Sequence, residues 1–142
     1  MSDTVTGAAV ADRNETFTVT VWGVRGSTPL CGAEFARYGG NTTCIEMRCG
    51  NEVLIFDGGT GIVAAGKRLV GESVGEIHLF LTHSHYDHVQ GLPFFAPLYK
   101  PHTRACIASG HLEGTMSTRE ILAHLMQPPL FPIDPGYLKA DI

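Results

Sequence analysis

The feature that most constrains this fold is a nearly continuous apolar run, Glu76–Thr82 (EIHLFLT), near the middle of the 142-residue chain. A strand with one face in water alternates apolar and polar residues, whereas an unbroken run is typical of a strand covered on both faces. A chain of this length can bury roughly two-thirds of its unfolded surface, so one core is expected. The sequence therefore predicts an internal sheet strand within a single domain.

Strands and helices alternate around this run. Ser117 followed by Glu120 matches a capping box, which marks the start of a helix. Four prolines after Gln127 argue against regular structure in the tail. The alternation predicts an α/β (or α+β) protein with a mixed sheet and flanking helices. The expected strands are 17–24, 43–48, 53–57, 76–82 and 103–109, and the expected helices run from about 61 to 70 and over 117–127.

Composition and charge exclude several classes of protein. Ten Lys and Arg against 14 Asp and Glu give a net charge of −4, and the cations are scattered. An extended nucleic-acid footprint needs clustered cations, so none is expected. No leader-like segment and no apolar run near the roughly 20 residues of a spanning helix is present, which favours a cytoplasmic protein without a membrane segment. The four cysteines lack CxxC spacing, and each is expected to be a reduced, buried side chain.

Four side chains that commonly bind metals fall within six residues, directly after the apolar strand. They are His83, His85, Asp87 and His88. Residues two apart in an extended segment project to the same side, so His83 and His85 can direct two imidazole nitrogens toward one metal. If a helix begins near Tyr86, Asp87 and His88 point together at a neighbouring position. Two-metal hydrolases hold their ions roughly 3.5–4 Å apart, which suits this arrangement.

At these residues the sequence resembles a known family. The segment THSHYDH is similar to the HxHxDH signature of the metallo-β-lactamase-fold hydrolases. The upstream segments VWGVRGSTP, RYGGNTTC and LIFDGGTGI resemble the opening of the phosphodiesterase-like branch, which is similar to the ribonucleases that mature tRNA 3′ ends. The resemblance covers about Phe17 to Phe95 and weakens toward Gln127.

Carried over by position, the resemblance implies a role for each member of the cluster. His83 and His85 would bind the first metal, and Asp87 and His88 the second. Asp87 would also be the catalytic residue that takes a proton from the attacking water. Zinc is the expected metal, one or two ions in the full site, with manganese or iron as alternatives.

Residues outside the cluster receive weaker assignments. The resemblance implies that Asp57, at the end of its strand, orients a ligating histidine from outside the ligand shell. A plain helix-opening acid is the alternative. The loop residues expected near the mouth of the site are Arg25, Ser27, Asn41 and Thr42. They are candidate substrate contacts, with turn formation as the simpler alternative.

The chain departs from the family pattern after His88. The resemblance implies an αββα sandwich of two similar halves, whose second half supplies the remaining ligands, and nothing later in this chain matches those ligands. The remaining histidines are expected to be structural or surface residues: His78, His102, His111 and His124. We therefore expect residues 1–15 to form a flexible N-terminus and 16–142 a partial domain lacking the second half. The isolated chain is expected to be inactive or weakly active.

The expected function is metal-dependent hydrolysis of phosphodiester bonds in the intact protein, on a small phosphodiester or nucleotide-like substrate. Half a sandwich would leave a sheet face uncovered, so we also expect self-association. One alternative is a non-catalytic interaction domain from a truncated hydrolase. A less favoured one is a dinucleotide-binding module, since Gly59–Ala64 fits G-x-G-x-x-A after a strand.

Overall fold

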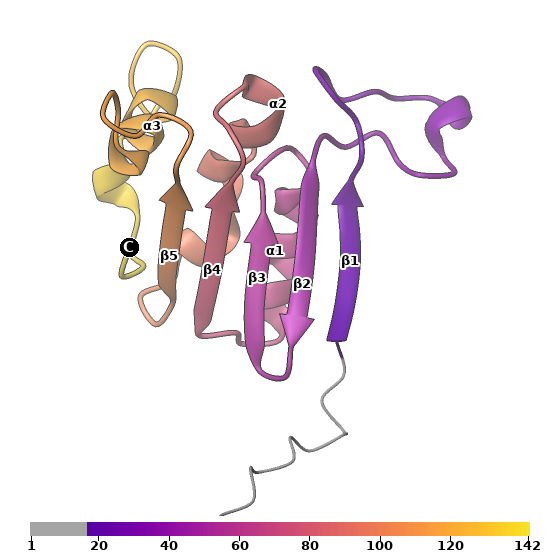
Figure 1. Cartoon of the computed structure of the whole chain (residues 1–142), viewed down its shortest axis with the longest axis horizontal. Coiled ribbons are helices and arrows are strands. Elements are labelled where there is room, and N and C mark those ends of the chain that lie inside the picture. Colours follow the sequence, from indigo (N-terminus) through magenta and orange to yellow (C-terminus); the bar gives the residue numbers. More distant parts are fainter. Residues whose placement is uncertain (1–16) are drawn as a thin grey trace, which may run out of the picture.

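A computed structural model describes residues 17–142, so the flexible N-terminus expected at 1–15 lies outside the described residues. Five strands form one sheet in the order β1-β2-β3-β4-β5 (Figure 1). The first three pair antiparallel, and β3, β4 and β5 pair parallel. The predicted mixed α/β sheet is confirmed. The strands are β1 (Phe17–Gly23), β2 (Cys44–Cys49), β3 (Glu52–Phe56), β4 (Glu76–Leu81) and β5 (Arg104–Ser109).

Helices occupy the connections between strands. The crossover from β3 to β4 is α1 (Ile62–Gly71), which lies behind the sheet in Figure 1. A short helix α2 (Tyr86–Val89) follows β4, and α3 (Thr118–Leu125) follows β5 with the predicted capping box of Ser117 and Glu120. The proline-rich tail contains one 3-10 turn. The 3-10 helices are η1 (Ala33–Phe35), η2 (Leu92–Phe94), η3 (Ala96–Tyr99) and η4 (Pro135–Tyr137).

The core lies on one face of the sheet. Alternate residues of the strands point to this face, and α1 and the 3-10 segments cover it. Ile62 and Leu69 of α1 are fully buried there, as are Phe95 and Leu98. The strand side chains buried on this inner face are Cys44, Glu46, Val53, Ile55, Ile77, Leu79, Leu81 and Ala105.

A buried carboxylate joins three elements on the inner face. Glu46 of β2 is 1% exposed and accepts hydrogen bonds from Trp22 Nε1 (2.9 Å), Arg48 Nε (2.6 Å) and Arg68 Nη2 (2.6 Å). Burial by itself raises the pKa of Glu46, but the three donors outweigh it and hold the pKa below its ordinary value. Glu46 is therefore a charged link between β1, β2 and α1.

The opposite face of the sheet, the outer face, carries apolar side chains that no other described element covers. Val19 and Val21 of β1 are 52% and 54% exposed, and burial along β4 alternates. Cover on both faces, expected from the EIHLFLT run, is therefore not present within residues 17–142. The outer-face residues are Phe17, Val19, Val21, Ile45, Met47, Leu54, Phe56, His78, Phe80, Cys106 and Ala108, together with Cys49, Glu52, Glu76 and Arg104 in line with Phe17.

The expectation of four buried cysteines is wrong for three of them. Only Cys44 is buried, and burial raises the pKa of its thiol to about 12. The other three, Cys31, Cys49 and Cys106, are exposed. The alternation of side chains along a strand explains part of the error. Cys106 is small and apolar, but its position in β5 directs its side chain to the outer face. In the part of the chain that the structure describes, no helix is both long and apolar enough to span a membrane.

Candidate metal centre

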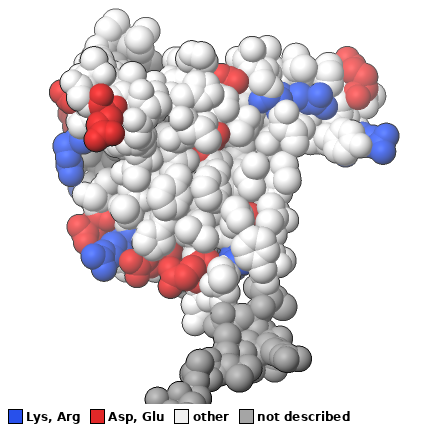
Figure 2. All heavy atoms as spheres, in the orientation of Figure 1, with Lys and Arg blue, Asp and Glu red and all other residues white. Residues whose placement is uncertain are grey.

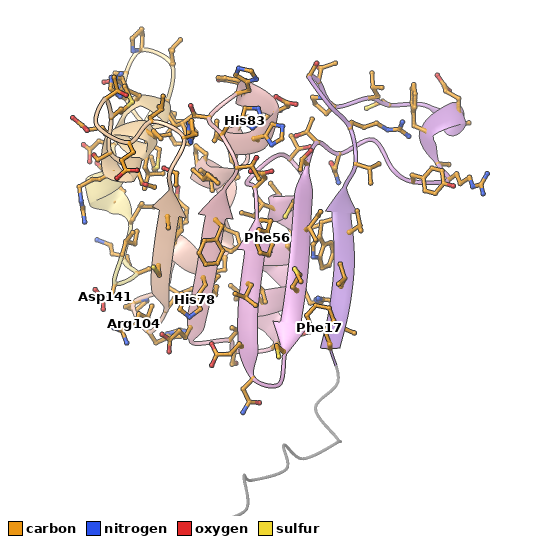
Figure 3. The ribbon with its side chains drawn as sticks, in the orientation of Figure 1. Phe17, Phe56, His78, His83, Arg104 and Asp141 are labelled. Atoms are coloured by element: carbon orange, nitrogen blue, oxygen red, sulfur yellow. The ribbon has the colours of Figure 1, made fainter. Side chains whose placement is uncertain are left out.

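The His/Asp cluster lies at the carboxyl ends of β3 and β4. The loop after β3 carries Asp57, and the loop after β4 carries His83 and His85 before α2 begins. Figure 3 shows His83 beyond the end of β4, close to α2. The carboxyl edge of parallel strands is the usual location of ligand sites in α/β sheets.

Backbone contacts fix α2 against the glycine loop that follows Asp57. Gly58 N donates to His88 O (2.6 Å), and Gly91 N donates to Gly58 O (2.8 Å). A Cβ on Gly59 would overlap the carbonyl oxygen of Asp87, so this close approach requires glycine. The backbone that carries Asp87 and His88 is thus positioned by main-chain atoms.

Asp57 lies next to the His/Asp cluster, is more buried than the cluster residues and contacts His88 through its carboxylate. It is 3% exposed, and its backbone lies in the left-handed region (φ 64°). Its carboxylate accepts from Thr82 N (2.8 Å) and from the Thr82 hydroxyl (3.0 Å), and its Oδ2 lies 2.8 Å from His88 Nδ1. A carboxylate at Nδ1 favours the tautomer with the proton there, which leaves the Nε2 lone pair free to bind a metal.

The free nitrogen of His88 faces Asp87. His88 Nε2 lies 3.5 Å from Asp87 Oδ2, and this oxygen accepts a hydrogen bond from Ser27 N (2.7 Å). The Ser27 N–H, opposed by partial desolvation and aided by neighbouring histidines, holds the pKa of Asp87 below its ordinary value. Two ligands each about 2.0–2.1 Å from a tetrahedral zinc are about 3.4 Å apart. The Asp87–His88 pair therefore fits a divalent cation in donor type and separation.

The His83–His85 pair is held less firmly. The ring centroid of His83 lies 4.5 Å from that of His85 and 4.0 Å from that of His88. Thr82 Oγ1 lies 3.1 Å from His83 Nδ1, whereas His85 is exposed. Desolvation, together with the neighbouring histidines, lowers the pKa of His83, which favours the neutral imidazole that binds metals.

The cluster does not form a ready three-ligand site. Within residues 17–142, no group of three His, Cys, Asp or Glu side chains is arranged to hold a metal ion. The predicted ligands lie together as two adjacent pairs, and a catalytic zinc normally takes three protein ligands.

The four candidate loop residues take different positions around the cluster. Ser27 contacts Asp87 through its backbone N–H, and Arg25 Nε donates to Gly39 O (2.9 Å). Thr42 is fully buried, and its N–H and hydroxyl exchange hydrogen bonds with Thr60 (2.9 and 2.8 Å). Asn41 Oδ1 accepts from Thr60 Oγ1 (3.2 Å). The side chains of Asn41 and Thr42 thus brace the glycine loop.

Two features near the cluster were not anticipated from the sequence. Thr82 donates hydrogen bonds to Asp57. Its position directly before His83 is the sequence feature that could have indicated this role. His111, expected to be structural or surface, is exposed and has Nε2 2.9 Å from the hydroxyl of Ser84, which lies between His83 and His85. This contact joins the loop after β5 to the loop after β4.

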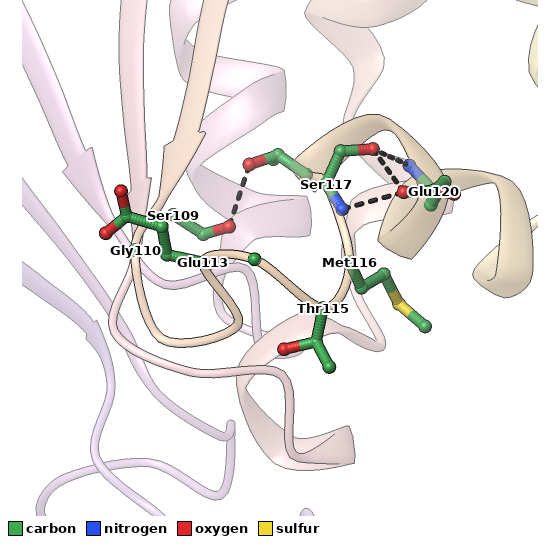
Figure 4. A pocket seen from close by; sticks show the side chains of 9 residues that line it. Ser109, Gly110, Glu113, Thr115, Met116, Ser117 and Glu120 are labelled. Atoms are coloured by element: carbon green, nitrogen blue, oxygen red, sulfur yellow. Dashed lines mark hydrogen bonds between the residues drawn. The ribbon is translucent and has the colours of Figure 1, made fainter.

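A hollow of about 730 Å³ lies in the segment after β5, and none of the predicted site residues lines it (Figure 4). Two of its hydroxyls are paired, Ser109 Oγ with Thr118 Oγ1 at 2.7 Å. Glu120 is occupied by the capping box, where Ser117 N and Oγ donate to it (2.8 and 2.7 Å). Most of its polar groups are therefore used in holding the start of α3.

Comparison with known protein families decides the assignment of the chain. The model of the metallo-beta-lactamase superfamily matches residues 37–136. The chain belongs to this superfamily. No curated protein and no solved structure matches it.

Membership in the metallo-beta-lactamase superfamily indicates metal-dependent hydrolysis as the general chemistry and a divalent metal, often zinc, as the general cofactor. The five-stranded mixed sheet with its helices is consistent with part of the superfamily fold. The matched range contains the whole His/Asp cluster and the glycine loop.

Proposed function

We propose that this chain carries part of the active site of a metal-dependent phosphodiester hydrolase. The observation that carries the proposal is the connected series Asp57, His88 and Asp87. A buried carboxylate fixes the imidazole at 2.8 Å, and the other nitrogen of that imidazole faces a second carboxylate at 3.5 Å. Carboxylate-oriented histidines are typical of metal centres.

Each residue has a distinct task in this proposal. Asp87 and His88 hold one divalent ion, and His83 and His85 contribute to a neighbouring one. Asp57 keeps His88 in the metal-binding tautomer and orientation. A bound divalent metal supplies Lewis acidity, which lowers the pKa of water toward roughly 7 and stabilises developing negative charge. Asp87, held by the Ser27 N–H with a lowered pKa, is ionised at neutral pH and can accept a proton from water.

The substrate class rests on the resemblance of VWGVRGSTP, RYGGNTTC and LIFDGGTGI to the phosphodiesterase-like branch. A small phosphodiester or nucleotide-like substrate is favoured over a long nucleic acid, because the ten Lys and Arg are scattered along an acidic chain. The mixed imidazole and carboxylate donors favour zinc, with manganese or iron as alternatives. The unpaired thiols agree with action in the cytoplasm.

The dinucleotide-binding alternative has little support, because the loop N–H groups that would bind a pyrophosphate are already used. Gly58 N donates to His88 O, Gly59 N to Thr43 O (2.9 Å) and Gly61 N to Thr42 O (3.2 Å). A Rossmann-type site instead presents such groups to the phosphates. These glycines allow close packing of α1 and α2.

The non-catalytic interaction domain remains a second candidate. The observation in its favour is that residues 17–142 contain no three-ligand group. Metal content separates the two candidates, since an interaction domain needs no bound metal.

The test is the zinc, manganese and iron content of the purified 142-residue protein by elemental analysis, followed by hydrolysis of bis(p-nitrophenyl) phosphate. We expect about one metal per chain, at most weak hydrolysis by the isolated chain, and a loss of the metal and of any hydrolysis in His88→Ala. His102→Ala, outside the cluster, is the matched control. Metal content near zero, unchanged by incubation with zinc, would refute the metal-centre proposal for this chain.

A further inference from the structure

A side-chain hydrogen bond joins the loop that carries His83 and His85 to the loop after β5. His111 Nε2 lies 2.9 Å from Ser84 Oγ, and Ser84 stands between the two histidines in the chain. The contact spans 27 positions of the sequence. It therefore links two candidate ligands to a loop that carries none of the predicted ligands.

The parallel pairing of β4 and β5 brings these two loops together. The last ladder pair is Leu81 with Ser109, and both strands end at this pair. Neighbouring strands lie about 4.8 Å apart, so residues that closely follow the two strands emerge side by side. Ser84 and His111 are such residues, and their contact follows from the register of the sheet.

The ligand loop, residues 82–85, is fixed at both ends by contacts within the metal centre. At its start, the Asp57 carboxylate accepts from Thr82 N (2.8 Å). At its end, His85 O accepts from His88 N (2.9 Å). Between these two points the loop is held through Ser84 by a residue from outside the metal centre.

His111 belongs to a turn that is itself anchored. Leu112 O accepts from Thr115 N (2.9 Å) within the turn. Where β5 ends, Ser109 Oγ lies 2.7 Å from Thr118 Oγ1 at the start of α3 (Figure 4). An anchored turn has little conformational freedom left to lose, so His111 is a suitable fixed point for the more exposed ligand loop.

The Ser84 side chain points away from the metal-binding imidazoles. His85 has an extended backbone (ψ 152°), and successive side chains of an extended segment project to opposite sides. Among the described residues, Ser84 and Tyr86 line a small hollow against α3, whereas His83 and His85 do not. The contact with His111 therefore holds the backbone of the loop and leaves both imidazoles free.

The surroundings of the contact set its expected strength. Among the described residues, Figure 2 shows no Lys or Arg on this face between α2 and the loop after β5. No cation there adds to the interaction or competes for the Ser84 hydroxyl. A neutral hydrogen bond of this kind changes an equilibrium by roughly two- to tenfold.

We propose that His111 is a positioning residue of the metal centre. Through Ser84 it holds the ligand loop in the conformation that directs His83 and His85 toward one ion. Its effect on metal binding rests on the proposed function, whereas the order of the loop can be measured without metal. The loop after β5 thus acts on the site through its contact with Ser84.

The first test measures the order of the ligand loop in the metal-free full chain by ¹⁵N relaxation. In the wild type, the backbone N–H order parameters of residues 83–85 should be near 0.85, and in His111→Ala they should fall below about 0.6. Glu113→Ala, at an exposed residue of the same turn, is the matched control and should leave them unchanged. His111→Gln places an amide near the position of the imidazole Nε2 and should restore most of the order.

The second test measures zinc affinity by competition with a chromophoric chelator. His111→Ala should weaken the binding of the first zinc ion about threefold, within the range of one neutral hydrogen bond, and His111→Gln should recover it. In a His83→Ala, His85→Ala background the same change should have no effect, because no imidazole remains on the loop to be positioned. Circular dichroism confirms that each variant is folded. A loss that persists in that background would overturn the proposal, because His111 would then act on the whole site.

The two measurements separate this proposal from the proposed function. If the chain binds no zinc, the proposed function fails, and the order parameters alone show whether His111 holds the loop. If zinc binds equally well to the wild type and to His111→Ala, the metal centre stands and the positioning role is wrong. Equal order parameters in these two chains would overturn the proposal whether or not zinc binds.

Discussion

The two halves of the His/Asp cluster differ in how the fold holds them. In the Asp87–His88 pair, His88 is bound by the buried Asp57 and Asp87 by the Ser27 N–H. In the His83–His85 pair, His83 has one neighbouring hydroxyl, that of Thr82, and His85 is exposed. One pair is therefore preorganised by the fold, and the other depends on what binds it.

This difference indicates an order of metal binding. A preorganised pair loses little conformational freedom when it binds an ion, whereas an exposed side chain must be ordered. We expect the first metal at the Asp87–His88 pair, with the His83–His85 pair filling only when a further ligand is supplied.

The largest effect is expected from loss of the braced histidine. His88→Ala should weaken the binding of the first zinc ion by about 1,000-fold. This exceeds the roughly 10–100-fold loss in affinity that is typical of removing a residue outside the ligand shell. His85→Ala should weaken it by only about tenfold. Competition titration of the metal-free chain with a chromophoric chelator measures both. Equal losses in the two variants would show that the pairs are not distinct.

Asp57→Asn tests whether the brace itself produces the asymmetry. The amide keeps the size of the side chain but weakens the hydrogen bond to His88 Nδ1, so zinc affinity should fall about 10–100-fold. The same titration measures it, with Asp134→Asn as control, because Asp134 caps η4 through Gly136 N (2.7 Å). A loss as complete as that of His88→Ala would make Asp57 a direct ligand.

Glu46→Gln tests whether the stability of the fold can change while the zinc affinity of the site does not. Loss of the charge that holds Arg48 and Arg68 should lower the free energy of unfolding by about 1.5 kcal/mol at pH 7, with zinc affinity unchanged.

The pH dependence of this effect follows from the lowered pKa of Glu46. Its contribution is fully present above pH 4.5, the ordinary value, and is lost as the pH falls below it, because the unfolded chain takes up the proton first. Wild type and variant should therefore converge below pH 4.5 in thermal unfolding between pH 3 and 7. A constant difference across this range would contradict the assignment.

The smallest effect is expected at Ser27, whose backbone is left-handed (φ 64°). Ser27→Gly relieves that conformation and keeps the N–H that binds Asp87, so stability should rise by about 0.5 kcal/mol. Zinc affinity should stay within about twofold. Chemical denaturation and the chelator titration measure the two quantities, and a marked fall in affinity would mean that the Ser27 side chain itself supports the Asp87–His88 pair.

The sequence predicted the local elements of the fold better than their long-range pairing. The hairpin of β2 and β3 has a local signal in the sequence, because its two strands flank a Cys-Gly-Asn turn. The pairing of β1 with β2 spans a loop of about twenty residues, for which no local signal exists. The run EIHLFLT has apolar residues on both of its sides and by itself predicted cover on both faces, whereas the family resemblance, through the missing second half, predicted an uncovered sheet face.

The same contrast holds at the site. The candidate metal ligands could be predicted from the sequence because they are close together in it: His83, His85, Asp87 and His88. The contacts that hold them come from elsewhere: Asp57 meets His88 across 31 positions, and Ser27 meets Asp87 across 60. Distances of this kind follow from the sheet topology, which a single sequence does not contain.

The junction at β3, antiparallel on one side and parallel on the other, has a consequence for the folding pathway. The β2–β3 hairpin closes a short loop and is expected to form early, whereas β4 can pair with β3 only after α1 has bridged them. Asp57 and His88 lie on opposite sides of that late step. The metal ligands are therefore brought together only near the end of folding. Metal in the refolding solution should leave the rate of the early folding phase unchanged, and metal bound to the folded chain should slow its unfolding.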